Sequence, residues 1–249
     1  MKATTETSAE RGAESAAACT GVVAAGPTAA GSAAAGDMRF APLGADEVAR
    51  FVPEREWCVE VLPADAAAMG RGMTFCCGCA ATPFGSVGVL SAGDEIYRLS
   101  FIGAAGCIDY GDARACRSFG EFLEACRCAW PGAHLLHDDG PAERVVATLL
   151  DRMSPCRFRV RVVGSEFRLN VWRALARVPW GATVSYSTLA AMAGVPRAVR
   201  AAALAVASND VGLLVPCHRV VRSDGSAGRF FWGLALKCTL LAWETWLQY

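Results

Sequence analysis

The chain divides into stretches that differ in how apolar and polar residues alternate. Residues 1–38 consist mainly of Ala, Gly, Ser and Thr, with almost no large apolar side chains. Because such a segment cannot bury enough surface to offset its loss of conformational entropy, we predict a disordered tail. Residues 39–72 carry scattered aromatic and aliphatic residues without a clear period, which predicts an irregular extension packed on the part that follows.

From Met73, short apolar runs separated by turn residues predict strands. The runs are TFCCGCA, SVGVLSA and EIYRLSFIG. Apolar residues at helical spacing in RSFGEFLEACRCAW, and Pro141 in the first turn of PAERVVATLLDRM, predict two helices after these strands. We therefore expect a small α+β domain over residues 73–160.

Residues 161–249 have a mainly helical pattern, which follows the alternating run RFRVRVVG. Ser165 is the expected N-cap of a helix over SEFRLNVWRALARV. Two short helices are then predicted in VSYSTLAAMAG, with Ser187 as its cap, and in PRAVRAAALAVAS, which Pro196 opens. Two such helices joined by a Gly-containing turn are typical of a helix-turn-helix, with an ordinary pair of core helices as the alternative.

Charge separates the two halves of the chain. Overall, 24 Lys and Arg residues balance 24 Asp and Glu residues. Residues 157–249 nevertheless hold 12 basic residues against 4 acidic ones, so the preceding part has an acidic excess of the same size. A basic half favours a polyanion as its partner, and a merely solvated basic surface is the alternative.

Twelve cysteines are irregularly spaced along the chain, and its first residues lack the apolar core of a secretory signal. We therefore expect reduced thiols in a cytoplasmic protein. No apolar run reaches transmembrane length, so no membrane contact is predicted. Cys76, Cys77 and Cys79 lie close together, but a structural zinc site needs four ligands and no second pair is in view, which favours core thiols.

The stretch LLVPCHRVV, residues 213–221, sets polar side chains into an apolar run. An unpaired polar group is costly in such surroundings. Pro216 removes a backbone donor and prevents a regular central strand, so we expect the chain to bend there and the thiol of Cys217 to line a pocket beside His218. A buried thiol without chemistry is the alternative, because that is the usual environment of a free cysteine.

An apolar helix near the C-terminus is predicted from GLALKCTLLAWETW, and it carries Glu244. A carboxylate on so apolar a helix is expected to be paired. His218 is its predicted partner.

Together these segments resemble the C-terminal domain of the O6-alkylguanine-DNA alkyltransferases over about residues 165–245. The matching segments, in order, are F-x3-V-W-x-A-L from Phe167, P-W-G-x-T-V-S-Y from Pro179, A-V-R-A from Ala198, Asn209, P-C-H-R-V from Pro216, and W-G-L-x-x-K with the downstream Glu244. The resemblance implies a DNA repair enzyme that flips O6-alkylguanine out of the duplex and transfers the alkyl group irreversibly to its own cysteine. O4-alkylthymine is a further candidate substrate.

The resemblance also implies roles in the reaction. Cys217 is the implied nucleophile, His218 removes its proton through a bridging water, and Glu244 orients the imidazole. Tyr186 is implied to donate to the guanine edge and to promote rotation of the nucleotide. Because the product is a thioether, each molecule is expected to act once.

Three further residues are implied to contact DNA. Arg200 would fill the space that the flipped base leaves, with Arg197 and Ala201 beside it on a helix in the minor groove. Double-stranded DNA containing O6-alkylguanine is thus the implied partner.

The remaining matches concern the pocket. Asn209 is implied to join the helix-turn-helix to the active-site loop, Lys237 to support that loop, and Val220 to contribute its carbonyl. The backbone N–H of Phe231 can donate to guanine O6, while its bulky side chain predicts a preference for small alkyl groups.

For the fold, the resemblance implies a ribonuclease H-like α+β N-terminal domain, through TPFGSVGVLSAGDEIYRLSF, and a winged helix-like, mainly α domain after it. A monomer without metal or cofactor is expected. Two alternatives stay open. Alkyltransferase-like proteins bind the lesion without chemistry but commonly have Trp in place of the cysteine, and a regulatory fusion would need a longer patterned segment before Met73.

Overall fold

Residues 38–50, 57–65, 67–68, 70–104, 116–151 and 155–245 are described in this computed structural model. Apart from Met38, the predicted tail over residues 1–38 lies outside these ranges. Each helix within them is too short or too polar to cross a lipid bilayer.

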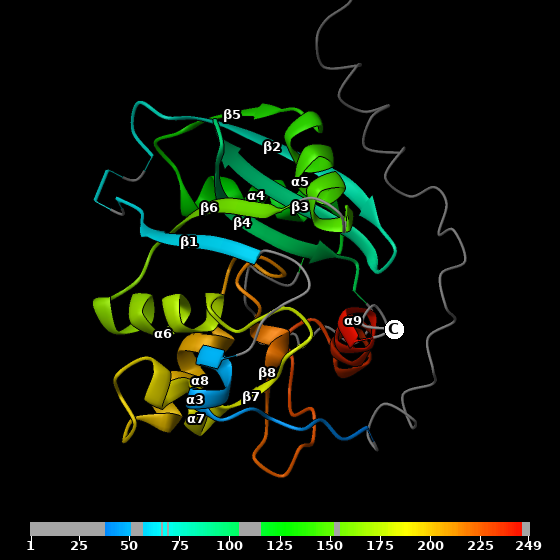
Figure 1. Cartoon of the computed structure of the whole chain (residues 1–249). Coiled ribbons are helices and arrows are strands. Elements are labelled where there is room, and N and C mark those ends of the chain that lie inside the picture. Colours follow the sequence, from blue (N-terminus) through cyan, green and yellow to red (C-terminus); the bar gives the residue numbers. More distant parts are fainter. Residues whose placement is uncertain are drawn as a thin grey trace, which may run out of the picture.

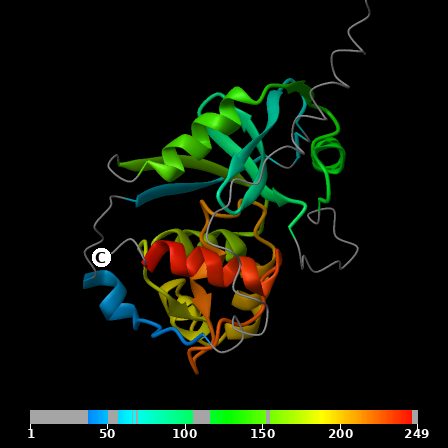
Figure 2. The same ribbon diagram turned by 90° about the vertical axis from the view of Figure 1, so that its right-hand side faces the viewer.

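A six-stranded mixed sheet forms the first part of the molecule, in the order β1-β6-β4-β3-β2-β5. β2, β3 and β4 are successive antiparallel strands, whereas β1 with β6, β4 with β6, and β2 with β5 pair in parallel. Both views show this sheet above a helical part (Figures 1 and 2). The strands are β1 (Trp57–Pro63), β2 (Thr74–Thr82), β3 (Gly85–Ala92), β4 (Glu95–Ile102), β5 (His134–His137) and β6 (Cys156–Val162).

Two helices cover opposite faces of the sheet. α4 (Phe119–Ala129) is capped by Ser118, which accepts a hydrogen bond from the backbone of Glu121, and α5 (Gly140–Leu150) has a proline in its first turn. Successive side chains of a strand point to opposite faces. Leu90 of β3 accordingly packs in the cluster with α4, whereas Val87 and Val89 pack in the cluster with α5.

The expectation of an irregular extension over residues 39–72 was wrong. This segment contains helix α3 (Ala45–Arg50) and strand β1. β1 pairs in parallel with β6 in a register that sets Trp57 opposite Cys156, about a hundred residues later. Because the partner strand is so distant along the chain, the short run WCVEVLP alone gave no sign of the pairing.

The second part is mainly helical, as expected. Ser165 caps α6, and α7 and α8 form the predicted helix pair around a turn at Gly194, whose φ is +76°. Ser185 rather than Ser187 caps α7, because the helix already begins at Tyr186. The elements are α6 (Glu166–Ala176), β7 (Val184–Ser185), α7 (Tyr186–Met192), α8 (Val199–Ala207), the 3-10 helix η1 (Cys217–Arg219), β8 (Val220–Val221) and α9 (Leu234–Thr245).

One continuous core joins the two parts. Buried residues of the sheet, among them Leu99 and Phe101, belong to the same cluster as buried residues of α6 and α8. The backbone of Leu99 bonds to Asp210 and Gly212 at 3.1 and 2.8 Å, so the chain that leaves α8 is fastened to β4. A side chain at Gly212 would meet the Trp232 ring at 2.8 Å, which explains why this close approach needs glycine.

The cysteines only partly match the expectation of reduced thiols. Cys77 is a fully buried free thiol, and Cys76 is also free. Cys79 is disulfide-bonded, which contradicts the expectation at this position. Irregular spacing along the sequence gave no information on which cysteines meet in space. Within the described residues, no three His, Cys, Asp or Glu side chains are grouped so that they could hold a metal ion.

Candidate functional site

Cys217 lies at a tight bend, as its position after Pro216 predicted. It begins η1, and its backbone N–H donates to the carbonyl of Val215 at 2.8 Å. Leu213, which precedes Cys217 by four residues, has a φ of +63°, a backbone conformation that residues other than glycine rarely adopt. Cys217 is 7 % exposed, so the bend presents it at the edge of the core.

Asn209 fixes this bend to the end of α8. Its Nδ2 donates to the carbonyl of Val215 at 2.8 Å and to Sγ of Cys217 at 3.3 Å, while its Oδ1 accepts from the backbone of Val211 at 3.0 Å. A donor that points at the sulfur stabilises the thiolate form. The predicted link from the helix pair to the loop is therefore present in these contacts.

The predicted contact between His218 and Glu244 is also present. Nε2 of His218 lies 2.8 Å from Oε1 of Glu244, and both side chains are almost fully buried. On the other edge of the imidazole, Nδ1 is buried and has no hydrogen-bond partner among the described residues. This nitrogen is thus open to a proton from a neighbouring group.

Arg219 is the second partner of the carboxylate. Its Nε and Nη2 donate to Glu244 at 2.9 Å, and its Nη1 donates to the carbonyl of Val178 at 2.7 Å. Gly181 adds a backbone N–H to Oε2 of Glu244 at 3.3 Å. The sequence indicated the carboxylate and its imidazole partner but no partner for Arg219, because the guanidinium and imidazole share one acceptor.

These contacts set the charges of the relay, which is the hydrogen-bonded pair of Glu244 and His218. Burial alone would raise the pKa of Glu244, but the charges of Arg219 and His218 outweigh it and lower the pKa to about 2. Burial lowers the pKa of His218, and Glu244 opposes this only in part. At neutral pH the carboxylate is ionised and the imidazole is neutral, which is the form that accepts a proton.

Lys237 is a buried cation whose charge interacts with Cys217. It is fully buried on α9, and its Nζ donates to the carbonyls of Val220, at 2.6 Å, and Ala227. Burial lowers its pKa to about 8, although the nearby Cys217 acts in the opposite direction. Its contact holds β8, which pairs with β7 immediately before Tyr186.

A cavity of about 460 Å³ opens over the thiol. Its wall is mostly apolar, and burial raises the pKa of Tyr186 at its edge, with Cys217 adding to the effect. Phe231 packs edge-on against Trp232 at 5.3 Å, whereas Val220 and Lys237 are not in the wall. The lining residues are Tyr186, Ala203, Leu204, Val206, Ala207, Asn209, Cys217, Arg229, Phe230, Phe231 and Trp232.

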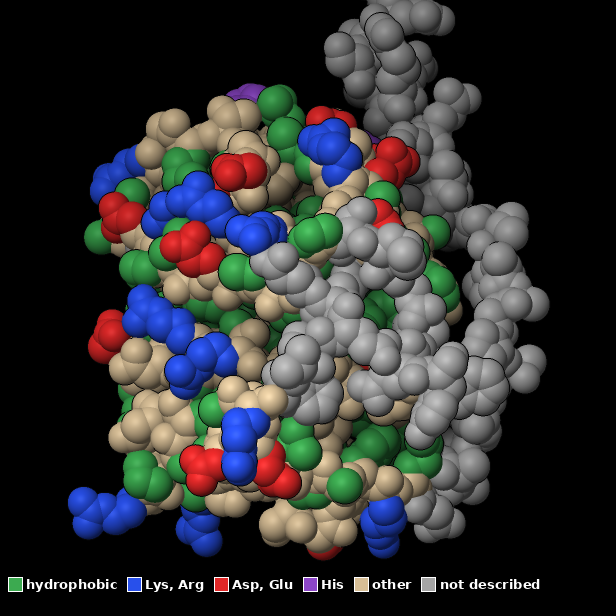
Figure 3. Space-filling model, in the orientation of Figure 1, with side chains coloured by type: hydrophobic (Ala, Val, Ile, Leu, Met, Phe, Trp, Pro, Cys, Tyr) green, Lys and Arg blue, Asp and Glu red, His purple; other side chains and the backbone are tan. Residues whose placement is uncertain are grey.

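The three residues expected to contact DNA lie on the outer face of the helix pair. Arg197, Arg200 and Ala201 are exposed, and none of them lines the cavity. Figure 3 shows basic side chains protruding along the lower edge of the helical part.

Leu204 is a cavity residue that was not predicted from the sequence. It follows Arg200 by one helical turn, is 73 % exposed and lines the cavity mouth. Counting α8 positions from Arg200 would have placed it on the same face.

Comparison with known proteins gives consistent results. Residues 166–246 match the family described as 6-O-methylguanine DNA methyltransferase, DNA binding domain. The inducible methylated-DNA–protein-cysteine methyltransferase of Bacillus subtilis (strain 168) is 38 % identical over 128 residues, which cover 50 % of this chain and 72 % of that protein.

A second relative is matched over a smaller share of its own length. The bifunctional transcriptional activator/DNA repair enzyme Ada of Escherichia coli (strain K12) is 41 % identical over 115 residues, which cover 43 % of this chain but only 32 % of Ada. The chain thus spans about a third of the length of Ada.

Among solved structures, that of Mycobacterium tuberculosis OGT in complex with DNA superposes with a TM-score of 0.52 and 23 % identity, covering 68 % of this chain and 92 % of that one. This likeness supports the fold alone: an α/β first part followed by a helical part.

Proposed function

This chain belongs to the methylated-DNA–protein-cysteine methyltransferase family, and from that premise we propose that it repairs DNA by accepting the alkyl group of O6-alkylguanine on Cys217. One observation carries the proposal: a thiol lines a cavity of about 460 Å³ next to a buried imidazole–carboxylate pair. A soft thiolate is suited to attack a saturated carbon, and a neighbouring base is needed to form it.

Proton removal begins the reaction. Neutral His218 takes the thiol proton at Nδ1 through a water, while Glu244 holds the opposite nitrogen and stabilises the imidazolium. The amide of Asn209 and the ammonium of Lys237 stabilise the thiolate. Both groups are already in position, so no large rearrangement is needed.

Alkyl transfer then exchanges one bond for another. A bond forms between Sγ of Cys217 and the alkyl carbon, the bond from that carbon to O6 breaks, and its electron pair goes to guanine. Tyr186 donates toward the guanine edge and the backbone N–H of Phe231 toward O6, and the thiol proton finally replaces the lost alkyl group. The thioether has no acyl carbon for water to attack, so the protein reacts once.

A contact between Lys237 and Val220 supports the loop that carries Cys217. Val220 contributes its carbonyl as the anchor of Lys237, which keeps the thiol loop attached to α9. O4-alkylthymine, which carries the same kind of alkyl–oxygen bond, is a second candidate substrate.

The direct test maps peptide masses after the protein is mixed with a duplex that carries one O6-methylguanine. We expect a one-methylene increase on the Cys217 peptide, in one equivalent per protein. Tight binding of the duplex with an unmodified Cys217 peptide would instead support a lesion-binding protein without chemistry.

Substrate size provides a second prediction. We expect faster inactivation by O6-methylguanine than by O6-benzylguanine, because the Phe231 ring occupies the cavity wall. Inactivation rates are measured with both compounds, and Phe231→Ala should raise the benzyl rate more than the methyl rate. Comparable rates in the parent protein would remove this idea.

DNA binding provides a third prediction. Arg200→Ala should impair flipping, read by the fluorescence of a base analogue at the target, more than it impairs affinity, because the side chain fills the vacated stack. Arg197→Ala is the matched control, expected to weaken affinity about as much without the loss of flipping. Equal flipping in the two variants would contradict the role of Arg200.

Several finer expectations remain part of this proposal. They are a ribonuclease H-like first domain over residues 73–160, now with β1 added to its sheet, and a winged helix-like DNA-binding domain over residues 161–249. Contact of α8 with the minor groove through Ala201 belongs here too. So do a monomeric state, a cytoplasmic location, and activity without metal or cofactor.

A further inference from the structure

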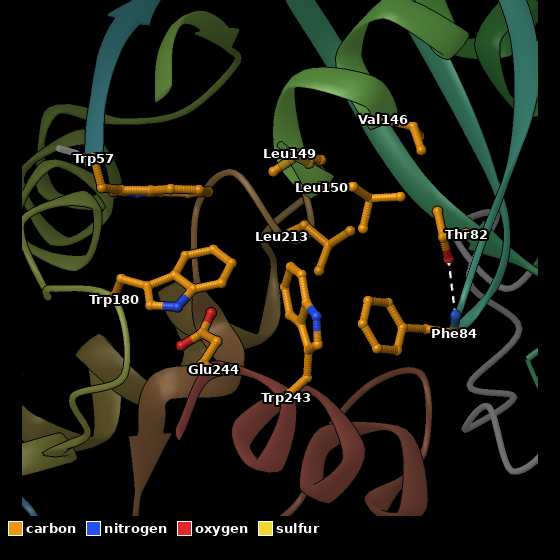
Figure 4. Close-up of a pocket in the computed structure, with 10 residues that line it drawn as sticks. All are labelled: Trp57, Thr82, Phe84, Val146, Leu149, Leu150, Trp180, Leu213, Trp243 and Glu244. Carbon is orange, nitrogen blue, oxygen red and sulfur yellow. Dashed lines mark hydrogen bonds between the residues drawn. The ribbon is translucent and has the colours of Figure 1, made fainter. Parts of the chain in front are cut away.

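Residues from both parts of the molecule form an aromatic wall beside Glu244, which consists of Trp57, Phe84, Trp180 and Trp243. Figure 4 shows Trp57 above Trp180, with Trp243 and Phe84 continuing the wall to the side. Neighbouring ring centroids along it are 5.2, 4.7 and 4.8 Å apart. The free space among these residues is only about 10 Å³, at the lower limit for one water molecule. The wall therefore keeps bulk water away from the carboxylate.

Trp57 is the residue that β1 contributes to this wall. Its ring lies 4.9 Å from Cζ of Arg219, and the Trp180 ring lies 5.4 Å from the same atom. An aromatic face attracts a cation, and more strongly when the cation is desolvated. Arg219 is fully buried, so this contact is of the stronger kind.

Burial is the largest cause of the lowered pKa of His218, and the charge of Arg219 acts in the same direction. The charged groups that act on the imidazole are Glu244 and Lys237 from α9 and Arg219 from η1. When Arg219 is bound to Glu244, the guanidinium compensates the negative charge of the carboxylate, and the imidazole can stay neutral. If the guanidinium moves away, the carboxylate favours the imidazolium, which cannot take the thiol proton.

We propose that Trp57 is a positioning residue through which the first part of the molecule holds Arg219 on Glu244 and so keeps His218 in its proton-accepting form. Trp57 lies outside residues 166–246, the segment that matches the family. The inference rests on the proposed role of His218 as the base. It gives the N-terminal sheet a part in the chemistry besides its packing.

The test compares Trp57→Leu, which removes the ring, with Trp57→Phe, which keeps an aromatic face. The indole nitrogen of Trp57 has no hydrogen-bond partner among the described residues, so the Phe variant removes no such bond. Trp130→Phe is the matched control, because Trp130 is a buried tryptophan in the other core cluster. The reaction of Cys217 with iodoacetamide is followed from pH 5 to 9 by peptide mapping, which needs no DNA.

The rate of Cys217 alkylation by iodoacetamide should rise with pH in the parent. In Trp57→Leu we expect this rise to occur at higher pH, so that the rate on the acidic side of the profile is about three- to tenfold lower than in the parent. The Phe variant should lie between Leu and the parent, and Trp130→Phe should match the parent. A uniform loss of rate without a displaced pH profile would overturn the proposal, since packing alone would explain it. So would equal displacement in Trp130→Phe.

Transfer from O6-methylguanine DNA, measured on the same proteins, separates this inference from the proposed function. A parent that does not accept the methyl group refutes that function, while a displaced iodoacetamide profile still supports the role of Trp57. A parent that accepts it, with an undisplaced profile in Trp57→Leu, refutes only the role of Trp57.

Discussion

Cys217→Ala is expected to abolish alkyl transfer completely. Cys217 is the only cysteine among the described residues that line the cavity, and Nδ2 of Asn209 donates to its sulfur at 3.3 Å. The variant should still fold, because the thiol is a small side chain at the edge of the core and its loss removes little buried surface. The measurement is the peptide mass after incubation with excess O6-methylguanine duplex, together with the fraction of lesion that remains.

Cys156→Ala is the matched control for this substitution. Cys156 is another fully buried thiol, on β6, and it lies away from the cavity. The control should take up one methyl group per protein like the parent. Methyl transfer to any other cysteine in Cys217→Ala would contradict the assignment of the acceptor.

Glu244→Gln is expected to lower both stability and transfer rate. The amide keeps the size of the side chain but leaves the buried guanidinium of Arg219 without a counter-charge. Removing one partner of a buried ion pair costs about 3–5 kcal/mol in unfolding free energy. Because the imidazolium loses its stabilising charge, alkyl transfer should slow about a hundredfold, while affinity for DNA should be spared.

The pH dependence of stability provides a separate measure of Glu244. Its pKa in the folded protein, about 2, lies below the ordinary value of 4.5. Ionisation of Glu244 therefore stabilises the fold fully above the ordinary value, and this contribution is lost as pH falls from there toward 2. Urea unfolding of Glu244→Gln across this window should have a flatter pH dependence than that of the parent.

Glu166→Gln is the control for Glu244→Gln. Glu166 pairs with Arg173 at 3.3 Å on the surface, with its side chain 73 % exposed. Exposed pairs contribute about 0–1 kcal/mol, so this variant should remain close to the parent. Equal transfer rates for Glu244→Gln and the parent would refute the role of Glu244 in the relay.

The location of the site was predictable because its signals are local. Pro216 next to Cys217 predicted a bend, and an isolated carboxylate among apolar residues of α9 predicted a buried partner. Capping by Ser165 and the helix pair were likewise legible, since a cap and a helical period involve residues only a few positions apart. The cap of α7 was misplaced by two residues, because two serines compete for that position.

The sequence by itself thus determined the chemistry of this protein: a thiol at a bend, an imidazole beside it and a carboxylate that needed a partner. Only the tertiary structure decided that Arg219 shares this carboxylate, that β1 belongs to the sheet and brings Trp57 to the guanidinium, and that Leu204 lies at the cavity mouth. The pattern of a segment tells which of its faces is buried, but not which distant segment covers that face. Those contacts join residues far apart along the chain, so the path of the whole backbone fixes them.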